Sequence, residues 1–165
     1  MKGVYHLKLT KKSIEGARIA LLPGDPGRVP LIASAVNKVN AKEIAQNREF
    51  RSWITRLDQH TILVTSTGIG GPSTSIAVEE LATLGVRMFI RLGTTGAIQS
   101  YVKAGDVVIT TASVRLDGTS EHYAPLSYPA VSDYYILNAL VEAASSLKVR
   151  HHVGITASTA TFYPA

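Results

Sequence analysis

Three glycine-containing loops carry the residue types best suited to binding an anionic ligand. The first is Gly24-Asp25-Pro26-Gly27-Arg28, which follows the short apolar run of residues 18–22. Glycine lets the backbone approach a ligand closely, and an arginine four residues later can clamp an oxyanion with charge-assisted hydrogen bonds. An ordinary Pro-Gly turn with a solvated arginine has the same composition. This loop alone therefore leaves a ligand site and a plain turn as alternatives.

Another loop follows Arg91 and has the sequence Gly93-Thr94-Thr95-Gly96. A guanidinium and two hydroxyls at the end of one strand suit the oxygens of a phosphate or a sugar. Arg91 also lies within an otherwise apolar strand, and a buried arginine requires an anionic partner. The partner would be either a carboxylate of the core or a bound anion. We favour the bound anion for this loop.

The remaining loop, residues 65–73, lies between a predicted strand and a predicted helix and contains Gly68, Gly70 and Gly71. It lacks the Gly-Lys-Ser/Thr of a nucleotide-binding P-loop and the G-x-G-x-x-G of a dinucleotide site. Its glycines indicate either close packing of the strand on the helix or a loop that contacts a ligand or another subunit. The sequence leaves both interpretations open.

Histidine and cysteine chemistry receives little support. The chain has five histidines and no cysteine, which excludes disulfides, cysteine-ligated zinc and thiol catalysis. Neither His-Glu-x-x-His nor Gly-x-Ser-x-Gly is present, so neither a zinc protease nor a hydrolase with a nucleophile elbow is predicted. His60, His151 and His152 are predicted to be structural or solvated. The residues leave open what His6 and His122 do.

Composition and charge describe a basic chain with enough apolar residues for a core. The 165 residues are 45% hydrophobic and carry a net charge of +5, and the basic excess lies in residues 1–60. Such a basic half can bind nucleic acid or a small anion. Its arginines are dispersed rather than clustered among aromatic residues, which favours discrete anion contacts. Without a membrane-spanning apolar run or a signal-peptide pattern, we expect a cytoplasmic protein with no membrane or nucleic-acid partner.

Apolar strands that alternate with amphipathic helices predict how these loops are positioned. Such alternation is typical of an α/β architecture in which loops at strand ends form the site. A further strand at 50–57 predicts a mixed central sheet, flanked by helices. Gly85 is expected to end one helix and Asp133 to cap another. The predicted strands are residues 18–22, 43–45, 50–57, 61–65, 87–92, 106–114 and 152–157, and the predicted helices are residues 29–36, 73–84 and a segment after Asp133.

The three glycine-containing loops and several further stretches of the chain, taken in order, resemble those of the nucleoside phosphorylase-I family. The resemblance covers essentially the whole sequence. Ser113-Val114-Arg115-Leu116-Asp117-Gly118 resembles the uridine branch of that family rather than its purine branch. Several matching stretches in the same order identify a family far more specifically than any single glycine loop does. The matching stretches are residues 6–10, 23–29, 47–50, 66–81, 91–99, 105–107, 112–118, 122–125 and 161–164.

The resemblance implies a fold and an activity. The fold would be of the nucleoside phosphorylase-I type, with residues 1–165 forming a single domain that corresponds to the N-terminal two-thirds of the family's domain. The activity would be that of a pentosyltransferase that reversibly cleaves uridine with phosphate into uracil and ribose 1-phosphate. Phosphate is then a co-substrate, and no organic cofactor is expected. The expected partners are a nucleoside, phosphate and further copies of the chain, as a dimer or a hexamer built of dimers.

The family's phosphate site carries over residue by residue to this sequence. By resemblance, Gly24, Arg28, Arg91 and Thr94 would hold the phosphate, and Arg48 would reach the same phosphate from a neighbouring subunit. Hydrolysis would not need three arginines on one anion, which favours phosphorolysis over a hydrolytic nucleosidase.

Other carried-over residues would hold the ribose, the base and a cation, and no residue is assigned a catalytic role. The His6 contact would cross the dimer interface. By resemblance, the ribose is assigned to His6 and Thr94, the base to Thr95, Gly96 and Phe162, and a monovalent cation such as potassium, bound between two subunits, to Glu49, Ile69 and Ser73.

The sequence departs from the family pattern near its C-terminal end. The resemblance implies that a glutamine and an arginine that recognise uracil, and a Met-Glu pair that binds the ribose hydroxyls, follow beyond position 165. Thr159-Ala160-Thr161 replaces a Ser-Asp-Thr pattern, and Ala165 replaces a usual glycine. We therefore expect a C-terminally incomplete chain that keeps the phosphate half of the site and has weak or absent turnover. The alternative is a non-catalytic truncated paralogue that binds phosphate and oligomerises.

Overall fold

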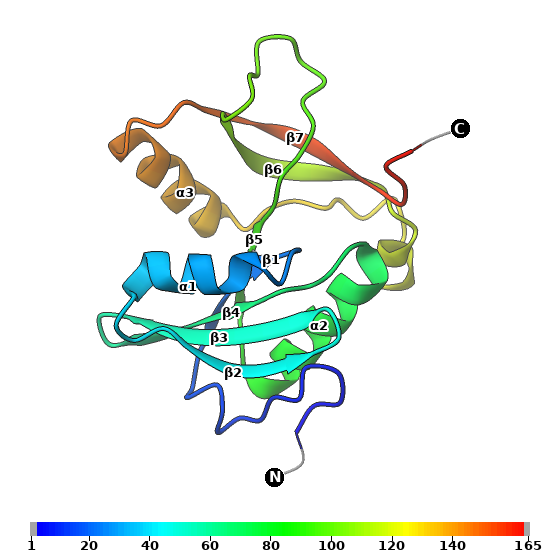
Figure 1. Ribbon diagram of the computed structural model, residues 1–165. Coiled ribbons are helices and arrows are strands. Elements are labelled where there is room, and N and C mark those ends of the chain that lie inside the picture. Colours follow the sequence, from blue (N-terminus) through cyan, green and yellow to red (C-terminus); the bar gives the residue numbers. More distant parts are fainter. Residues whose placement is uncertain (1–2, 164–165) are drawn as a thin grey trace. The chain divides into compact units, whose positions relative to one another are not determined.

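The computed structural model describes residues 3–163, with the helices and strands labelled in Figure 1. The chain divides into two compact units, Met1–Thr94 and Thr95–Ala165, and each has its own sheet and helices. The single domain that the resemblance implies stays a prediction. Ala165, which replaces the family's usual glycine, lies outside the described residues.

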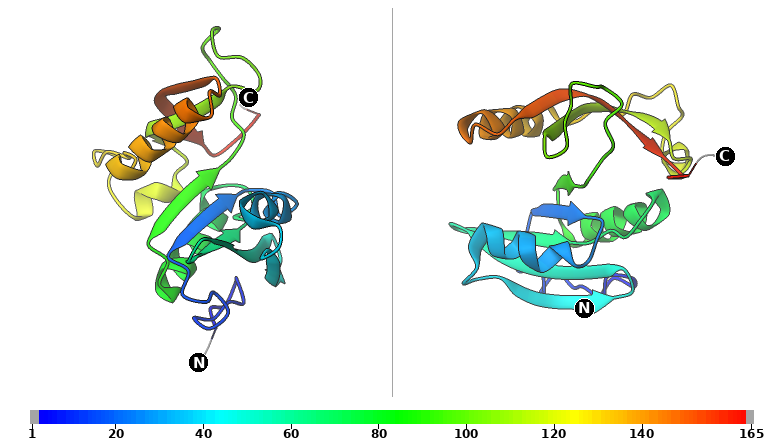
Figure 2. Two further views of the ribbon diagram at one scale, coloured as in Figure 1. Left: turned by 90° about the vertical axis from the view of Figure 1, so that its left-hand side faces the viewer. Right: turned by 45° about the horizontal axis from the view of Figure 1, so that its top comes forward.

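A five-stranded mixed sheet forms the centre of the first unit. Its strands are β1 (Ile19–Pro23), β2 (Lys42–Asn47), β3 (Phe50–Leu57), β4 (His60–Thr65) and β5 (Met88–Leu92). Their order is β2-β3-β4-β1-β5, so the cyan β2–β3 pair lies at one edge and the green β5 at the other (Figure 2). Strand β1 runs parallel to β4 and β5, whereas β3 runs antiparallel to β2 and β4. The loops that follow β1, β4 and β5 therefore begin at the same edge of the sheet.

Helices cover both faces of this sheet, because successive residues of each strand point to opposite faces. Val64 of β4 packs with α1 (Arg28–Asn37) on one face. Its neighbour Leu63 packs on the other face with α2 (Gly71–Leu84) and the N-terminal segment around Leu7. This two-sided packing holds the three loops at the end of β1, β4 and β5 on a rigid base.

The ends of α2 follow from local backbone requirements. The helix begins after Gly70, and Pro72 lies in its first turn. Proline fits there because the N–H groups of the first turn have no acceptor within the helix, so the missing N–H of proline costs no hydrogen bond. It ends at Gly85, whose φ of 115° is left-handed and whose N–H bonds back to carbonyls of the last turn. The predicted stop at Gly85 is confirmed.

The second unit contains a two-stranded parallel sheet with one long helix against it. Strand β6 (Val107–Leu116) pairs with β7 (His151–Thr159), and α3 (Tyr134–Ser146) contacts both strands. His152 Nε2 lies 2.8 Å from Asp106 Oδ2 at the start of this sheet. That pairing fits the structural role predicted for His152.

The start of α3 has the predicted cap. Asp133 Oδ1 accepts hydrogen bonds from the N–H groups of Tyr135 and Ile136, each at 3.0 Å. The cap satisfies two donors that a helix start would otherwise leave free. The structure adds a short 3-10 helix, η1 (Thr119–His122), which the sequence did not predict because four residues are too few to show a periodic pattern.

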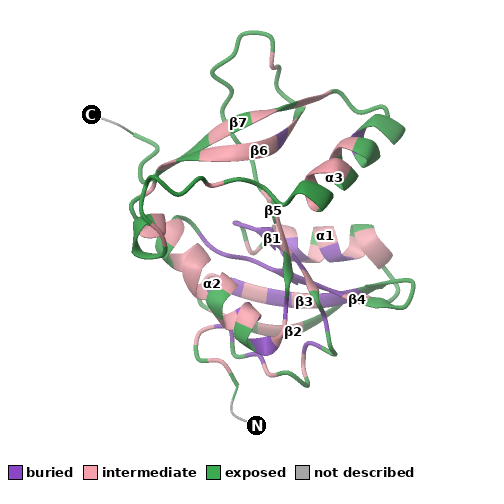
Figure 3. Cartoon of the chain, turned by 180° about the vertical axis from the view of Figure 1, so that it is seen from behind, coloured by how far each residue is buried: buried purple, intermediate pink, exposed green. Residues whose placement is uncertain are grey.

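Buried residues are concentrated in the first unit, where β1, β3, β4 and α2 carry most of the purple in Figure 3. In the second unit, Ile109 and Ala144 are the buried residues among those described. The described chain is a mixed α/β structure with a mixed central sheet flanked by helices, which confirms the predicted fold class. Between residues 3 and 163, no helix combines the length and the apolar character needed to cross a membrane.

Candidate functional site

The loop after β1 leads directly into α1 and is stabilised by its own aspartate. Asp25 Oδ1 accepts a hydrogen bond from Gly27 N–H at 2.7 Å, and Arg28 N–H donates to the backbone oxygen of Asp25 at 3.1 Å. Gly24 is buried, and Arg28 is the first residue of α1. The positive end of the helix dipole and the Arg28 side chain therefore lie at the end of the same loop, which favours a bound anion.

The loop after β4 lies against the loop after β1. Thr67 N–H donates to the backbone oxygen of Pro23 at 2.9 Å, and Gly68 N–H donates to that of Gly24 at 3.0 Å. Thr67 is fully buried. These hydrogen bonds join two loops rather than a strand and a helix, so both roles left open for the glycines at 65–73 stay predictions, and the loop fixes the position of Gly24.

Arg91, near the end of β5, reaches across to the same place. Its Nη1 donates to the backbone oxygens of Leu22 at 3.0 Å and Leu92 at 3.1 Å. A Cβ added at Gly24 would meet Arg91 Nη2 at 3.1 Å, so the guanidinium lies directly against the glycine. The expectation of a buried arginine is corrected here: the residue as a whole is exposed, only its guanidinium is partly covered against Gly24, and its partners are carbonyls.

The charges of Arg28 and Arg91 act on each other. The pKa of Arg91 lies below its ordinary value. The larger cause is partial burial of the guanidinium, and the smaller cause is the nearby positive charge of Arg28. Among residues 3–163, no carboxylate lies within ion-pair distance of Arg28, Arg48 or Arg91. Two neighbouring cations that have no counter-ion among the described residues are stabilised when an anion binds between them.

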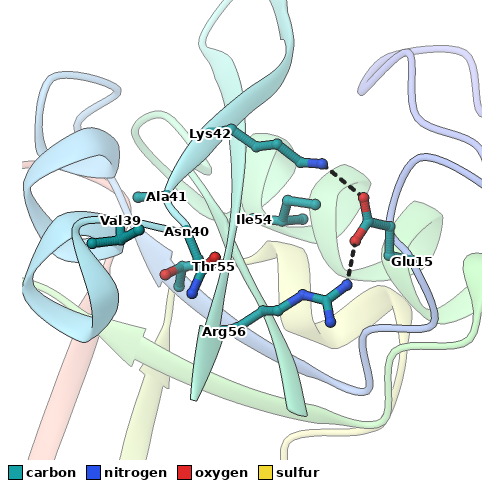
Figure 4. A pocket seen from close by; sticks show the side chains of 8 residues that line it. All are labelled: Glu15, Val39, Asn40, Ala41, Lys42, Ile54, Thr55 and Arg56. Carbon is teal, nitrogen blue, oxygen red and sulfur yellow. Dashed lines mark hydrogen bonds and ion pairs between the residues drawn. The ribbon is translucent and has the colours of Figure 1, made fainter. Parts of the chain in front are cut away.

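A second cationic cluster of the first unit is paired with a carboxylate of the same chain. Lys42 Nζ lies 2.8 Å and Arg56 Nη2 lies 3.0 Å from the two carboxylate oxygens of Glu15. Figure 4 shows both side chains reaching Glu15. The three residues line a hollow of about 200 Å3. Hydrogen bonds from Lys42 and Arg56 lower the pKa of Glu15. The two cations beside this hollow therefore share a carboxylate of their own chain, whereas no described carboxylate pairs with the arginines at the Gly24 loop.

Arg48 lies at the turn between β2 and β3, where its φ is 54°. This left-handed backbone is uncommon for a residue with a side chain. Ser66 holds the turn in place, because its Oγ donates to the backbone oxygen of Glu49 at 2.6 Å and accepts from Arg51 N–H at 2.8 Å. The turn is thus anchored to the loop after β4, and Arg48 lies exposed on it.

The three predicted cation ligands gather around Gly68. A Cβ at Gly68 would meet Glu49 Cγ at 2.6 Å and Ser73 Oγ at 3.3 Å, so both side chains lie against the glycine. Ser73 Oγ also donates to the backbone oxygen of Ile69 at 3.0 Å. Carboxylate, hydroxyl and carbonyl oxygens are the donors that hard cations prefer. The residues present therefore fit a monovalent cation, although residues 3–163 hold no cluster of three or more His, Cys, Asp or Glu side chains suited to a metal.

His6 is fixed by a carboxylate that the sequence analysis did not single out. Its Nδ1 lies 2.7 Å from Glu80 Oε1, and its backbone N–H donates to the same carboxylate at 2.9 Å. Glu80 lies on α2, seventy-four positions away in the sequence. No local pattern could have revealed this pairing, since it depends on where the N-terminal segment meets the helix.

The residues carried over for the base belong to the second unit. Thr95, Gly96 and Phe162 are exposed there, and Thr94, the last residue of the first unit, is exposed as well. The structure brings together Gly24, Arg28 and Arg91, and separately Glu49, Ile69 and Ser73. The assignments of Thr94, Thr95, Gly96 and Phe162 stay predictions.

Comparisons with known proteins place this geometry in context. Residues 18–165 match the model of the family described as the phosphorylase superfamily. The chain is 58% identical over 161 residues to uridine phosphorylases of Salmonella typhimurium and Escherichia coli K12, covering 98% of this chain and 63% of each relative. It is 53% identical over 159 residues to the uridine phosphorylase of Thermococcus kodakarensis, covering 96% of this chain and 56% of that relative. The chain thus spans less than two thirds of the length of the relatives it matches.

Proposed function

Because the chain belongs to the phosphorylase superfamily, we propose that it binds inorganic phosphate at the Gly24 loop and takes part in the reversible phosphorolysis of uridine. The products would be uracil and ribose 1-phosphate. Similarity to curated uridine phosphorylases supports this choice of nucleoside. The proposal makes the chain a pentosyltransferase with inorganic phosphate as co-substrate and no organic cofactor.

One observation carries the phosphate assignment. Arg91 Nη2 lies against Gly24, the positive charge of Arg28 is close enough to lower the pKa of Arg91, and no described carboxylate pairs with either arginine. Phosphate offers the charge and the several oxygens that two guanidiniums can bind, in part bidentately. A lone chloride carries a single negative charge against the two guanidiniums, and it lacks the several oxygens to which their N–H groups could donate.

The reaction explains why binding phosphate in one orientation would be useful. The C1′–N1 bond of uridine breaks and its electron pair leaves with uracil, while a phosphate oxygen forms the new bond to C1′. The hydrogen of monohydrogen phosphate ends on N1 of uracil, so the atoms balance. Positive charge develops on the sugar in the transition state, and a phosphate held by Arg28 and Arg91 is positioned for attack and offsets that charge. We assign no residue to leaving-group protonation.

Further contacts are proposed from the family's pattern. Thr94 would touch both phosphate and ribose, and Thr95, Gly96 and Phe162 would contact the base. Arg48 and His6 would reach the site of a neighbouring copy, so that the functional form is a dimer or a hexamer of dimers. Their anchored surroundings support this part, because Ser66 holds the Arg48 turn and Glu80 holds His6.

A monovalent cation such as potassium would be held by the Glu49 carboxylate, the Ile69 carbonyl and the Ser73 hydroxyl. When bound, it would supply positive charge between two copies of this turn, and it would take no part in bond breaking. The closeness of Glu49 and Ser73 to Gly68 supports the assignment.

The experiment that tests the proposal follows uridine cleavage by absorbance, with and without phosphate, on a sample whose intact mass is confirmed as 17.7 kDa. Phosphate binding is measured in parallel by isothermal titration calorimetry. We expect phosphate to bind and any cleavage to depend on it. Phosphate binding without turnover would support a non-catalytic phosphate-binding oligomer instead. Cleavage that is independent of phosphate would indicate a hydrolase, and a folded chain that binds no phosphate would contradict the site.

A further inference from the structure

Glu80 makes an unusually complete set of contacts with the N-terminal segment. Its Oε1 lies 2.7 Å from His6 Nδ1 and 2.9 Å from His6 N. Its Oε2 accepts from Leu7 N–H at 2.9 Å and from His6 N–H at 3.1 Å. The Glu80 side chain is 16% exposed and the His6 side chain 31%. One carboxylate thus fixes both the backbone and the ring of His6.

These contacts determine which ring nitrogen carries the hydrogen. Burial alone would raise the pKa of Glu80, but hydrogen bonds from Leu7 and His6 outweigh it, so that the pKa is lowered and the group is an anion near neutral pH. An ionised carboxylate only accepts hydrogen bonds. His6 Nδ1 must therefore be the donor, and the neutral ring then has its free lone pair on Nε2.

Asn47 holds His6 from another direction and connects it to the Arg48 turn. Asn47 Nδ2 donates to the backbone oxygen of His6 at 2.7 Å. Asn47 is also the last residue of β2 and directly precedes Arg48. A hydrogen bond thus joins His6 to the residue that directly precedes Arg48, so the two residues that would reach a neighbouring copy lie on connected segments. No described residue bonds to His6 Nε2, so this atom is free to contact a ligand.

We propose that Glu80 is a positioning residue that keeps His6 in the Nδ1–H form, so that Nε2 accepts a hydrogen bond from a sugar hydroxyl of the bound nucleoside. The sugar part of this inference rests on the proposed function, whereas the form of the ring does not. Without Glu80, the neutral ring of a histidine can carry its hydrogen on either nitrogen and can rotate. Either change would move the accepting lone pair of His6 Nε2 away from the sugar hydroxyl that donates to it.

The first test reads the ring directly on the unaltered 165-residue chain. Long-range 1H–15N correlation spectra at alkaline pH, where imidazole is neutral, distinguish protonated from unprotonated ring nitrogens. The His6 signals are assigned by their absence in His6→Gln. We expect protonated Nδ1 and unprotonated Nε2 for His6, and a mixture of both forms in Glu80→Gln. A His6 ring protonated on Nε2 in the unaltered chain would overturn the proposal, whether or not the variant folds.

The second test separates positioning from general damage to the fold. Glu80→Gln is compared with Glu79→Gln, which removes the same charge from an exposed neighbouring position of α2. We expect Glu80→Gln to raise the KM for uridine about five- to tenfold, as for the loss of one well-oriented hydrogen bond, and to leave the KM for phosphate unchanged. Glu79→Gln should change neither.

The outcomes keep the two proposals apart. Equal rises in both KM values would indicate a structural role for Glu80, and an unchanged KM for uridine would remove the sugar contact. If the unaltered chain neither binds nor cleaves uridine, the sugar contact fails together with the proposed function. The spectra still decide whether Glu80 sets the form of the His6 ring.

Discussion

The guanidinium of Arg91 lies against the backbone of Gly24, so close that the side chain of any other residue at position 24 would press against it. A Cβ at position 24 would come within 3.1 Å of Arg91 Nη2 and 3.2 Å of the backbone oxygen of Gly68. The loops after β1, β4 and β5 therefore meet at this glycine. Its lack of a side chain is what allows the arginine of the third loop to reach the first.

Replacing Gly24 with alanine should disturb phosphate binding more than it disturbs the fold. The new methyl group displaces the guanidinium of Arg91, and we expect phosphate affinity to fall by about 1.5–3 kcal/mol, the range of one lost hydrogen bond to a charged group. Calorimetry with inorganic phosphate measures the change. Gly154→Ala is the matched control, because nothing lies within 4 Å of its added Cβ. Equal affinity of the two variants would contradict the placement of the anion.

Arg28→Ala and Arg91→Ala should each weaken phosphate binding by about 1.5–3 kcal/mol, as expected for hydrogen bonds to a charged group. Arg18→Ala serves as the control, since Arg18 is exposed and precedes β1 at the opposite end of that strand. Titration of each variant with phosphate gives the affinities. If the phosphate affinity of Arg28→Ala or Arg91→Ala is unchanged, the arginine replaced in that variant does not bind phosphate.

Gly68→Ala should destabilise the first unit through two separate effects. The φ of 70° is unfavourable for alanine, and the added Cβ would meet Glu49 Cγ at 2.6 Å. We expect a loss of about 1–3 kcal/mol in the free energy of unfolding measured in urea. Gly85→Ala has a similarly left-handed backbone with nothing within 4 Å, so it should show only the backbone effect, about 1 kcal/mol.

The double variant Gly68→Ala/Glu49→Ala separates the two effects at Gly68. Removing Glu49 Cγ relieves the shortest contact and should recover part of the stability. No recovery would show that the close approach of Glu49 to Gly68 has no energetic role.

Stability should fall in acid, and Glu80 should contribute to the fall. Its pKa in the folded protein lies below the ordinary value of 4.5, so its stabilising contribution is complete above that value. The contribution is lost as the pH falls through the lower folded-state pKa. We expect the free energy of unfolding to fall less between pH 7 and pH 3 in Glu80→Gln than in the unaltered chain. Parallel curves for the two proteins would contradict this.

Removing the cap of α3 should loosen the second unit locally. Asp133→Ala leaves the N–H groups of Tyr135 and Ile136 without their acceptor, at a cost of about 1 kcal/mol. Amide hydrogen exchange should become faster at these two positions. Glu142→Ala, on the exposed side of the same helix, is expected to leave both rates unchanged, and identical exchange in the two variants would argue against the cap.

Most elements of the fold were predictable because their signals are local. The glycine after residue 84 and the aspartate before Tyr134 each mark a helix end through the chemistry of a few neighbouring groups. The antiparallel strand at 50–57 follows from a short hairpin with β2. The 3-10 helix at Thr119–His122 escaped prediction, since its four residues are held by contacts of the surrounding loop rather than by a repeating pattern.

The candidate site was predictable only in part. The resemblance implied Gly24, Arg28 and Arg91 as one site, and the structure brings them together because parallel strands place such positions at one edge of the sheet, while their phosphate role stays a prediction. The backbone carbonyl partners of Arg91 could not be predicted from the sequence, because a guanidinium bonds to backbone oxygens as well as to carboxylates. Glu80 was also out of reach, because its contact with His6 joins positions seventy-four residues apart.

The distribution of buried residues has a consequence for how the molecule is made. Among the described residues of the first unit, the buried ones run from Leu7 to Val86, and the parallel strands β1, β4 and β5 are complete by Leu92. Proteins are synthesised from the N-terminus, and compact units fold as they leave the ribosome. A nascent chain therefore contains every described residue of this core, and with it the Gly24 loop and Arg91, before β6, α3 and β7 have been translated.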